Sequence, residues 1–379
     1  MGASNEHYET VVIGGGQAGL SVGYYLKQRK RPFVILDANE RIGGSWWTRT
    51  WSSLRLFTPA RYDGLPGWPF PAPGWSYPTA RETAEYLAAY AARFELPVET
   101  SVTVDRVSKN GDGFLVGCGS RVLQTDNVVV ATGFYGTPAV PPFAPKLDPS
   151  IVQMHSSAYR DPSQLRPGGV LLVGAGNSGA DIAMELAATH RTWLSGRDKG
   201  QVPIRIESRS ARFLLPVLWF VASHVLTVKT PLGRKVRPHV LANGAPLIRV
   251  KNGDLASAGV ERVPKTVDVK DGLPVLEDGR VLDVENVIWC TGFRQNYGWI
   301  DAPVFDGASA PVHERGVASE PGLYFVGLDF LYSFTSENVG GVRRDAKHIA
   351  KHIAARSLDS HHEGMRELRR GESRRSAVL

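Results

Sequence analysis

Short apolar runs that end in glycine recur along the chain, and segments with helical spacing separate them. The run Val11–Ile13 is β-branched, as is typical of a buried parallel strand, and leads into a glycine turn, a small-residue helix and a second run, Phe33–Leu36. The run Val170–Val173 starts the same series again, and the strands at residues 127–134 and 286–293 both end in Thr-Gly-Phe. This duplication predicts an α/β protein with two Rossmann-like dinucleotide-binding domains.

The first glycine turn has the complete context of a dinucleotide-binding fingerprint. Gly14 permits the tight turn, Gly16 lets the backbone approach a pyrophosphate, and Gly19 lets the helix pack closely on the sheet. The helix N-terminus offers N–H groups to phosphates, and Asp37 follows the second strand, where it can accept hydrogen bonds from ribose hydroxyls. A glycine-rich turn without a ligand is the alternative. The predicted contacts are Gly14, Gly16, Gln17, Ala18, Gly19 and Asp37.

The second glycine turn is followed by a base instead of an acid. Asp37 lies 23 positions after Gly14, and the residue 23 positions after Gly174 is Arg197. An acid suits a free ribose 2′-hydroxyl and an arginine suits a 2′-phosphate, so we expect FAD or NAD at the first site and NADP at the second. For Arg197, a solvated loop cation is the alternative. The predicted contacts are Gly174, Gly176, Asn177, Ser178, Gly179, Ser195, Arg197 and Lys199.

Composition narrows the classes of function. The 379 residues suffice for two domains, and the net charge of +7, from 44 basic and 37 acidic residues, favours anionic ligands such as two dinucleotides. No basic stripe with interleaved aromatic residues indicates nucleic acid. Cys118 and Cys290 are far apart and form no CxxC, which argues against a redox disulfide and fits a reducing cytoplasm. We expect a cytoplasmic protein without a metal site.

One apolar stretch, from Phe213 to Val228, is unusually long for this chain. Pro216, Ser223 and His224 interrupt it, and it is shorter than a membrane span. We interpret it as a buried helix or channel wall, with a membrane-dipping segment as the alternative, and expect no stable membrane insertion. The N-terminus lacks the apolar segment of a signal peptide.

Aromatic residues gather after the first site. Trp46, Trp47 and Trp51 suggest a wall beside a flat ring, with ordinary core packing as the alternative. The following stretch, from Leu56 to Tyr77, is rich in proline, glycine and aromatic residues. Because so many aromatic side chains must be buried, it is predicted to be an ordered irregular loop.

Further elements complete the two domains. They are a helix over 81–94 capped by Thr79 with Glu82 in the capping-box position, strands at 103–107 and 114–116 around a hairpin turn at 110–113, a strand at 323–329 and a helix from 340 to about 355. The last strand and helix are expected to return to the first sheet. We therefore assign residues 1–165 and 293–360 to a discontinuous FAD-binding domain, 166–292 to an NADP-binding domain and 361–379 to a disordered tail.

Together these motifs resemble the class B flavin-dependent monooxygenases, which include the flavin-containing, Baeyer–Villiger and YUCCA-type enzymes. The likeness extends to about residue 355. It is carried by Gly14-x-Gly16-x-x-Gly19 with Asp37, Gly43-Gly44-Ser45-Trp46, Ala131-Thr132-Gly133-Phe134, Gly174-x-Gly176-x-x-Gly179, Cys290-Thr291-Gly292-Phe293 and Tyr324-Phe325-Val326-Gly327-Leu328.

The sequence departs from this family at two places. Of the fingerprint between the two glycine motifs, His155 and Tyr159 match, whereas Pro149 and Ile151 stand where Phe and Gly are expected. The flavin-containing monooxygenases carry an asparagine near the place of Phe57, and Phe57 cannot donate a hydrogen bond to an oxygenated flavin. Plain packing is the alternative role of Phe57. These departures leave the subgroup open and predict leakage to hydrogen peroxide.

The resemblance implies a chemistry as well as a fold. NADPH would reduce FAD, oxygen would form a C4a-(hydro)peroxyflavin, and one oxygen atom would pass to the sulfur, nitrogen or carbonyl group of a small organic substrate. Further FAD contacts are predicted at Ser45, Trp46, Val104, Thr132, Gly133 and Asp329, and catalytic contacts at Phe57 and Trp46. A reductase that passes electrons to a carrier, a peroxide-forming oxidase and a redox sensor without turnover are the alternatives. We expect a monomer or homodimer.

Overall fold

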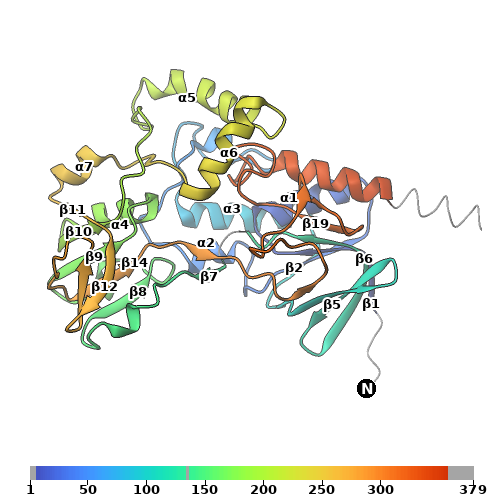
Figure 1. Cartoon of the computed structure of the whole chain (residues 1–379). Coiled ribbons are helices and arrows are strands. Elements are labelled where there is room, and N and C mark those ends of the chain that lie inside the picture. Colours follow the sequence, from blue (N-terminus) through green and yellow to red (C-terminus); the bar gives the residue numbers. More distant parts are fainter. Residues whose placement is uncertain (1–5, 134–135, 357–379) are drawn as a thin grey trace, which may run out of the picture.

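Two sheets, each containing one of the glycine turns, form the body of the protein (Figure 1). This computed structural model describes residues 6–133 and 136–356. The predicted tail at 361–379, and Phe134 of the first Thr-Gly-Phe motif, lie outside these ranges. In Figure 1 the second sheet lies on the left and the first on the right, so the two duplicated halves lie side by side in one molecule.

The first sheet is organised around β1 (Glu6–Ile13), whose last four residues are buried. β1 runs parallel to β2 (Phe33–Leu36) on one side and to β6 (Arg121–Val130) on the other. Beyond them lie β3 (Val98–Glu99) and β19 (Leu323–Phe325), both also parallel. Since β19 pairs with β6, the chain returns to this sheet after the second half, which confirms that the first domain is discontinuous.

An antiparallel extension continues the first sheet on one side. It consists of β4 (Arg106–Asn110), β5 (Gly113–Cys118) and the first half of β6, with β16 (Ile300–Asp301) parallel to β4. The β4–β5 hairpin turns at residues 111 and 112, as predicted. The strand expected at 103–107 begins only at Arg106, because the preceding chain runs along the end of β2, where the Val102 N–H donates to the Asp37 carbonyl.

The second sheet is parallel throughout, in the order β11-β10-β9-β14-β8. Its strands are β8 (Val152–His155), β9 (Gly169–Val173), β10 (Arg191–Ser195), β11 (Glu261–Val263) and β14 (Asn286–Trp289). β8 pairs with β14 along its whole length. The predicted limit at residue 165 assigns β8 to the first domain and so does not follow the sheets. A short strand without its own glycine turn carries no local signal for the sheet that it joins.

Helices pack on the sheets as the repeating pattern predicts. α1 (Gln17–Gln28) and α3 (Ala80–Arg93) belong to the first sheet, α4 (Asn177–Leu186) to the second, and a final helix covers residues 343–356. The predicted capping box is confirmed at the start of α3. The Thr79 hydroxyl accepts from the Glu82 N–H (3.1 Å), and the Glu82 carboxylate accepts from the Thr79 N–H (2.7 Å).

Shorter elements connect these layers. They are α2 (Gly44–Thr48), η1 (Ala60–Tyr62), β7 (Thr137–Pro138), η2 (Ala144–Lys146), η3 (Pro162–Gln164), α7 (Asn252–Ser257), β12 (Thr266–Lys270), β13 (Leu273–Leu276), β15 (Phe293–Arg294), β17 (His313–Glu314) and β18 (Val317–Ala318). β7 and β15 pair antiparallel with each other. They are the two passages of the chain between the halves, so the connection is a two-stranded ribbon.

The apolar stretch that begins at Phe213 lies outside both sheets, at the top of Figure 1. It forms α5 (Ala211–Phe220) and a π-helical turn, η4 (Val221–Val225), and α6 (Pro231–Asn243) follows. Phe213 is 82% exposed. The expectation of a buried helix or channel wall is therefore wrong, because apolar content does not determine what covers a helix. Within the described ranges, no helix has both the length and the apolar character needed to cross a membrane.

The capping box at the start of α3 gives a stability prediction. Thr79→Ala removes the hydroxyl that satisfies the Glu82 N–H, and we expect it to lower the free energy of unfolding by about 1 kcal/mol. Urea denaturation followed by circular dichroism would measure this loss. Ser120→Ala, in an exposed turn, is the control and should change little. Equal midpoints for the two variants would contradict the capping role.

Candidate functional site

Three glycines in the first turn have different steric roles. A Cβ atom on Gly14 (φ 113°) would lie 2.4 Å from the Ala131 carbonyl oxygen, and one on Gly19 would lie 1.9 Å from the Gly14 carbonyl oxygen. A Cβ on Gly16 would meet no described atom within 4 Å. The outer glycines therefore allow close backbone packing, whereas Gly16 borders open space. This is the arrangement expected of a cradle for a pyrophosphate.

The open space adjoins the N-terminus of α1. Gly16 is the N-cap residue, and no described side chain caps the helix there. The first turn also carries no acidic residue. The first N–H groups of this twelve-residue helix thus remain available to an anionic group, which the helix dipole also favours.

Asp37 lies beside this loop and stabilises it. The carboxylate accepts hydrogen bonds from the Gly15 N–H (2.6 Å), the Asn39 N–H (2.7 Å) and the Asn39 side-chain amide (2.6 Å). A carboxylate has about four acceptor positions, so these three bonds leave room for one further donor such as a ribose hydroxyl. Asp37 therefore holds the glycine turn and can also contact a dinucleotide.

Other predicted contacts lie at the same carboxyl edge of the first sheet. A Cβ on Gly327, just after β19, would lie 3.0 Å from the Ala18 side chain, so the end of β19 borders the start of α1. Thr132 and Gly133 follow β6, and Val104 packs against the apolar cluster that contains Ile13 and Leu36, at the ends of β1 and β2. Ligands of parallel sheets bind at this edge.

Asp329 is exposed there and is hydrogen-bonded to the carboxyl group of Glu337. Burial raises the pKa of Glu337 to about 9, and the nearby Asp329 adds to the rise. Glu337 is therefore largely protonated near neutral pH. Sequence reasoning selected Asp329 and missed Glu337, because the partner is eight positions away in an irregular loop.

The second glycine turn repeats the geometry of the first. A Cβ on Gly174 (φ 116°) would lie 2.2 Å from the Cys290 carbonyl oxygen, and one on Gly179 would lie 2.0 Å from the Gly174 carbonyl oxygen. A Cβ on Gly176 would again meet nothing within 4 Å among the described atoms. Gly176 is the N-cap residue of α4, and the first turn contains no acid. The molecule therefore has two dinucleotide cradles of the same design.

Residues beyond the second turn differ in their surroundings. Ser195 is buried, and its hydroxyl bonds to the Pro264 carbonyl (2.9 Å) and the Thr266 hydroxyl (2.8 Å), so it joins β10 to the following chain. Arg197 and Lys199 lie in the exposed loop after β10. A third cation missed in the sequence, Arg262 on β11, donates to the Gly196 carbonyl (3.3 Å). With Asp198 between Arg197 and Lys199, the end of β10 carries three cations and one acid and is basic.

Asn177 and Ser178 occupy the first turn of α4. The Asn177 amide donates to the Pro246 carbonyl (3.0 Å) and accepts from the Ile248 N–H (2.9 Å). Its side chain thus holds the 246–248 segment against the helix N-terminus. Ser178 is half-buried beside it. Asn177 shapes the cradle through this segment.

Arg249, the residue after Ile248, links the two halves of the molecule. Its guanidinium donates to the Leu56 carbonyl (2.9 Å) and lies 5.6 Å from the centre of the Phe57 ring. It also lies 3.8 Å from the Asp181 carboxylate on α4. Burial raises the pKa of Asp181 to about 6, and Arg249 opposes this rise. Sequence reasoning missed Arg249, although a lone arginine within Leu247–Val250 was a signal for a buried cation.

The predicted catalytic residues, Trp46 and Phe57, lie at the junction of the two halves, the region where Arg249 contacts Leu56 and Phe57. Trp46 is partly buried and packs against the apolar core between α1 and α3 as well as against the core between β9 and α4. Phe57, under the Arg249 guanidinium, is half-buried. Trp51 is a core residue of the cluster between β9 and α4, so the alternative of ordinary packing holds for it.

A buried acid lies in the loop beside Phe57. Asp63 is fully buried, accepts a hydrogen bond from Thr58 (2.5 Å), and its second carboxyl oxygen has no hydrogen-bond partner among the described residues. Burial raises the pKa of Asp63 to about 8, while the bond from Thr58 opposes the rise. Asp63 is thus largely protonated at neutral pH. Its loop is ordered as predicted, since the Tyr86 and Tyr90 hydroxyls donate to backbone carbonyls in it.

His155 ties the fingerprint between the glycine motifs to the connecting ribbon. Its Nε2 donates to the Gly292 carbonyl (2.9 Å), and its Nδ1 accepts from the Ser157 N–H (3.2 Å). Burial lowers the pKa of His155, so the neutral ring that this arrangement needs is favoured. The matching aromatic, Tyr159, is buried and donates to Glu185 (2.9 Å). The retained half of the fingerprint therefore has a structural role.

Neither cysteine is suited to disulfide chemistry. Cys118 and Cys290 are both free thiols. Burial raises the pKa of Cys290 to about 12, so its reactive thiolate form is scarce at neutral pH. This argues against a mechanism that passes electrons to a disulfide through the protein's own thiols.

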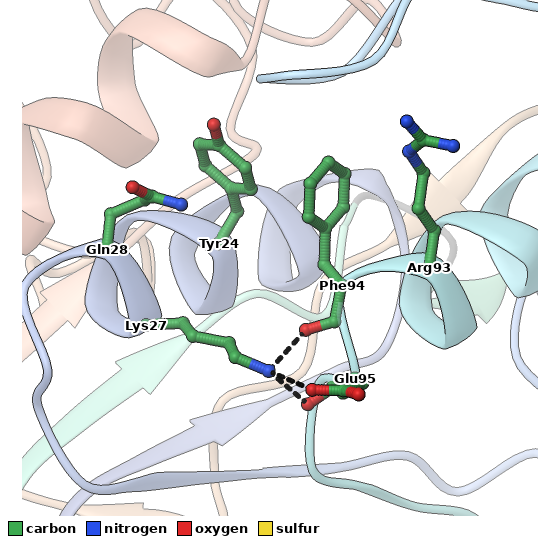
Figure 2. Close-up of a pocket in the computed structure, with 6 residues that line it drawn as sticks. All are labelled: Tyr24, Lys27, Gln28, Arg93, Phe94 and Glu95. Atoms are coloured by element: carbon green, nitrogen blue, oxygen red, sulfur yellow. Dashed lines mark hydrogen bonds and ion pairs between the residues drawn. The ribbon is translucent and has the colours of Figure 1, made fainter.

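Two remaining features lie away from the cradles. His348 and His352 on the final helix have a spacing that can suit a metal, but their rings stack edge to face at 4.5 Å, and no group of three metal ligands occurs within the described residues. Figure 2 shows a surface pocket at the C-terminal end of α1, where Lys27 donates to the Phe94 carbonyl (2.8 Å) and pairs with Glu95 (3.0 Å). It lies at the opposite end of α1 from the glycine turn.

Comparison with known proteins identifies the family. The pyridine nucleotide-disulphide oxidoreductase family matches residues 11–203, which is just over half of the chain. A CzcO-like oxidoreductase of Geobacillus kaustophilus is 38% identical, covering 91% of this chain and 98% of its own length. A probable indole-3-pyruvate monooxygenase of Arabidopsis thaliana is 29% identical over 91% of this chain and 86% of its own.

A solved structure of a flavin monooxygenase has the same overall fold as this chain. A mutant of the flavin monooxygenase from Stenotrophomonas maltophilia superimposes with a TM-score of 0.74 at 28% identity, covering 93% of this chain and 99% of the other. The two glycine cradles described above are what a flavin and a nicotinamide dinucleotide require. The chain is therefore an oxidoreductase of the pyridine nucleotide-disulphide oxidoreductase family and belongs, within it, to the class B flavin-dependent monooxygenases, enzymes of FAD and NADPH.

Proposed function

We propose that this protein is an NADPH-dependent flavoprotein monooxygenase that transfers one oxygen atom of O2 to the sulfur, nitrogen or carbonyl group of a small organic substrate. The observation that carries the proposal is the pair of cradles on one chain, each with an open middle glycine beside an uncapped helix N-terminus. Family membership supports the same conclusion.

The first cradle fits FAD. Its pyrophosphate would lie over Gly16 and the N-terminus of α1, and Asp37 has one acceptor position left for the ribose. Bound there, FAD accepts a hydride and activates oxygen, whereas the protein supplies position and exclusion of water. The further contacts proposed for FAD are Ser45, Trp46, Val104, Thr132, Gly133 and Asp329.

The second cradle fits NADPH. Gly176 and the N-terminus of α4 would hold its pyrophosphate, and Arg197 would pair with the 2′-phosphate. Arg197 is exposed near Lys199 and Arg262, and because these three cations outnumber the adjacent Asp198, this end of β10 attracts a phosphate group. Ser195 would act indirectly, by fixing the end of the strand.

The reacting groups would meet at the junction of the two halves, where Trp46 and Phe57 lie. Their aromatic surfaces favour a dry pocket and an apolar or aromatic substrate. We infer that Asp63 holds a proton next to this pocket, since its carboxyl group is buried beside the Phe57 loop and has a free oxygen. The relative named as a probable indole-3-pyruvate monooxygenase makes a 2-oxo acid one substrate class to test.

Two matched glycine variants test the cofactor assignment. Gly16→Ala and Gly176→Ala add a methyl group in open space, so neither should disturb the fold. Each methyl group would block phosphate contacts worth roughly 1.5–3 kcal/mol, a loss of about tenfold or more in affinity. We expect Gly16→Ala to lose FAD and Gly176→Ala to keep FAD but bind NADPH weakly, as measured by flavin absorbance and titration. Loss of the same cofactor in both variants would refute the assignment.

The preference for NADPH over NADH tests Arg197. A partly desolvated arginine–phosphate contact contributes roughly 1.5–3 kcal/mol, or about 10- to 150-fold in affinity. We expect Arg197→Ala to abolish this preference in steady-state kinetics and to leave NADH unchanged. The control is Arg191→Ala, at the other end of β10. If the wild type used both cofactors equally well, Arg197 would be only a loop cation.

Oxygen isotope incorporation tests the reaction itself. We expect thioethers, amines, cyclic ketones or 2-oxo acids to yield a product that carries one atom from ¹⁸O2 for each NADPH consumed by the coupled reaction. Part of the NADPH should be lost as hydrogen peroxide, because Phe57 offers no hydrogen-bond donor to the oxygenated cofactor. Mass spectrometry and a peroxide assay would give both quantities.

Each alternative function predicts a different fate for the electrons of NADPH. A peroxide-forming oxidase would convert all consumed NADPH to hydrogen peroxide with every compound tested. A reductase would consume NADPH at an appreciable rate only with an added electron carrier. A redox sensor would show no steady consumption. Any of these results across the whole screen would overturn the monooxygenase proposal.

A further inference from the structure

The outer face of α5 is apolar and uncovered. Its exposed apolar side chains, with Phe213 at 82% and Val217 at 60%, fall within an arc of about 160° around the helix. They are Phe213, Leu214, Val217, Leu218 and Phe220. Isolated exposed apolar residues are ordinary, but a contiguous face of this kind marks an interaction surface.

The opposite face of this helix is already occupied. The Trp219 ring stacks on Tyr62 of the first domain, with 4.7 Å between the ring centres. The following turn is fixed as well, since Arg344 donates to the Ser223 carbonyl (2.6 Å) and the Val228 N–H donates to the Tyr332 carbonyl (2.9 Å). α5 is thus held on the protein by one side, its apolar side chains on the other side are exposed, and the helix lies at the upper margin of Figure 1.

The chain segment that contains α5 and α6 is basic, and the nearest acid before it, Glu207, pairs with Arg249 (3.6 Å). Residues 208–253 contain eight basic residues and no acidic residue, whereas the whole chain has a net charge of +7, so the rest of the chain is close to neutral. Arg249 and Lys251 of this set point into the protein. The exposed cations are Arg209, Arg212, Lys229, Arg234 and Lys235.

We propose that α5 docks this enzyme on the surface of an anionic lipid bilayer. An apolar helix face on a segment rich in exposed lysine and arginine suits the boundary between acyl chains and negatively charged headgroups. With ten residues, α5 is too short to span a bilayer, so the contact is peripheral. A second copy of the chain is a poorer partner, because a two-fold interface would bring two cationic surfaces together.

Vesicle flotation of the full-length protein tests the proposal. We expect binding to vesicles of phosphatidylcholine with about one third phosphatidylglycerol, little binding to phosphatidylcholine alone, and loss of binding at high salt. Phe213→Ser with Val217→Ser should weaken binding at least about tenfold. Lys229→Gln with Lys235→Gln should weaken binding only to the anionic vesicles.

Matched controls separate docking from general surface effects. Val122→Ser with Val281→Ser removes exposed apolar side chains elsewhere, and Lys265→Gln with Lys270→Gln removes exposed lysines elsewhere. Both controls should bind as the wild type does. Because all these side chains are exposed, the melting temperature and the flavin content should stay the same in every variant.

Three results would overturn the proposal. One is no flotation of the wild type with anionic vesicles at low salt. Another is equal loss of binding in the α5 variant and in the valine control. The third is a dimer in light scattering that Phe213→Ser with Val217→Ser dissociates, without any vesicle binding by the wild type, which would assign this face to a second copy. The proposal of oxygenase activity would stand in each case, since flotation does not depend on turnover.

Discussion

The contact between the first and third glycine of each turn constrains the rest of the molecule. At Gly19 and at Gly179, a methyl group would lie within about 2 Å of a carbonyl oxygen, so the helix can begin this close to its strand only with glycine there. This closeness places the N-termini of α1 and α4 over the carboxyl edges of their sheets. In each cradle, this packing brings the open middle glycine next to the uncapped N–H groups of the helix. In the second cradle it also brings the basic end of β10 close to them, so that one dinucleotide could contact all of these groups.

Two such cradles form one active site only if they face each other. The connecting ribbon of β7 and β15, the bond from His155 to the Gly292 carbonyl, and the reach of Arg249 to the Leu56 carbonyl hold the halves together. The junction also gathers aromatic side chains and the buried acid Asp63. Because Asp63 is fully buried there, its charge and proton have larger effects than they would at the surface. Because the buried thiol of Cys290 is unreactive, the redox groups would be the cofactors FAD and NADPH.

The two faces of α5 have different surroundings, one exposed and one packed on the protein. Its apolar residues on the outer face would be a liability for a protein that stays in water. Its inner face packs on Tyr62, and the chain after it pairs with the 330–336 loop through Thr227 and Ser333. A surface that is apolar and basic has a clear physical partner in an anionic bilayer. Such docking would bring the junction of the two halves close to a phase where apolar substrates dissolve.

The sequence alone determined the features that depend on neighbouring residues. The order of strand, glycine turn and helix, the capping box of Thr79 and Glu82, the β4–β5 hairpin and the discontinuous first domain all follow from local patterns or from their repetition. The tertiary structure decided features that depend on residues distant in the chain. Arg249 meets Phe57 and Glu337 meets Asp329 only through packing, Ser195 faces inward, β8 joins the second sheet, and the apolar face of α5 remains uncovered. Periodicity states which side of an element is apolar, but only the folded chain determines what covers that side.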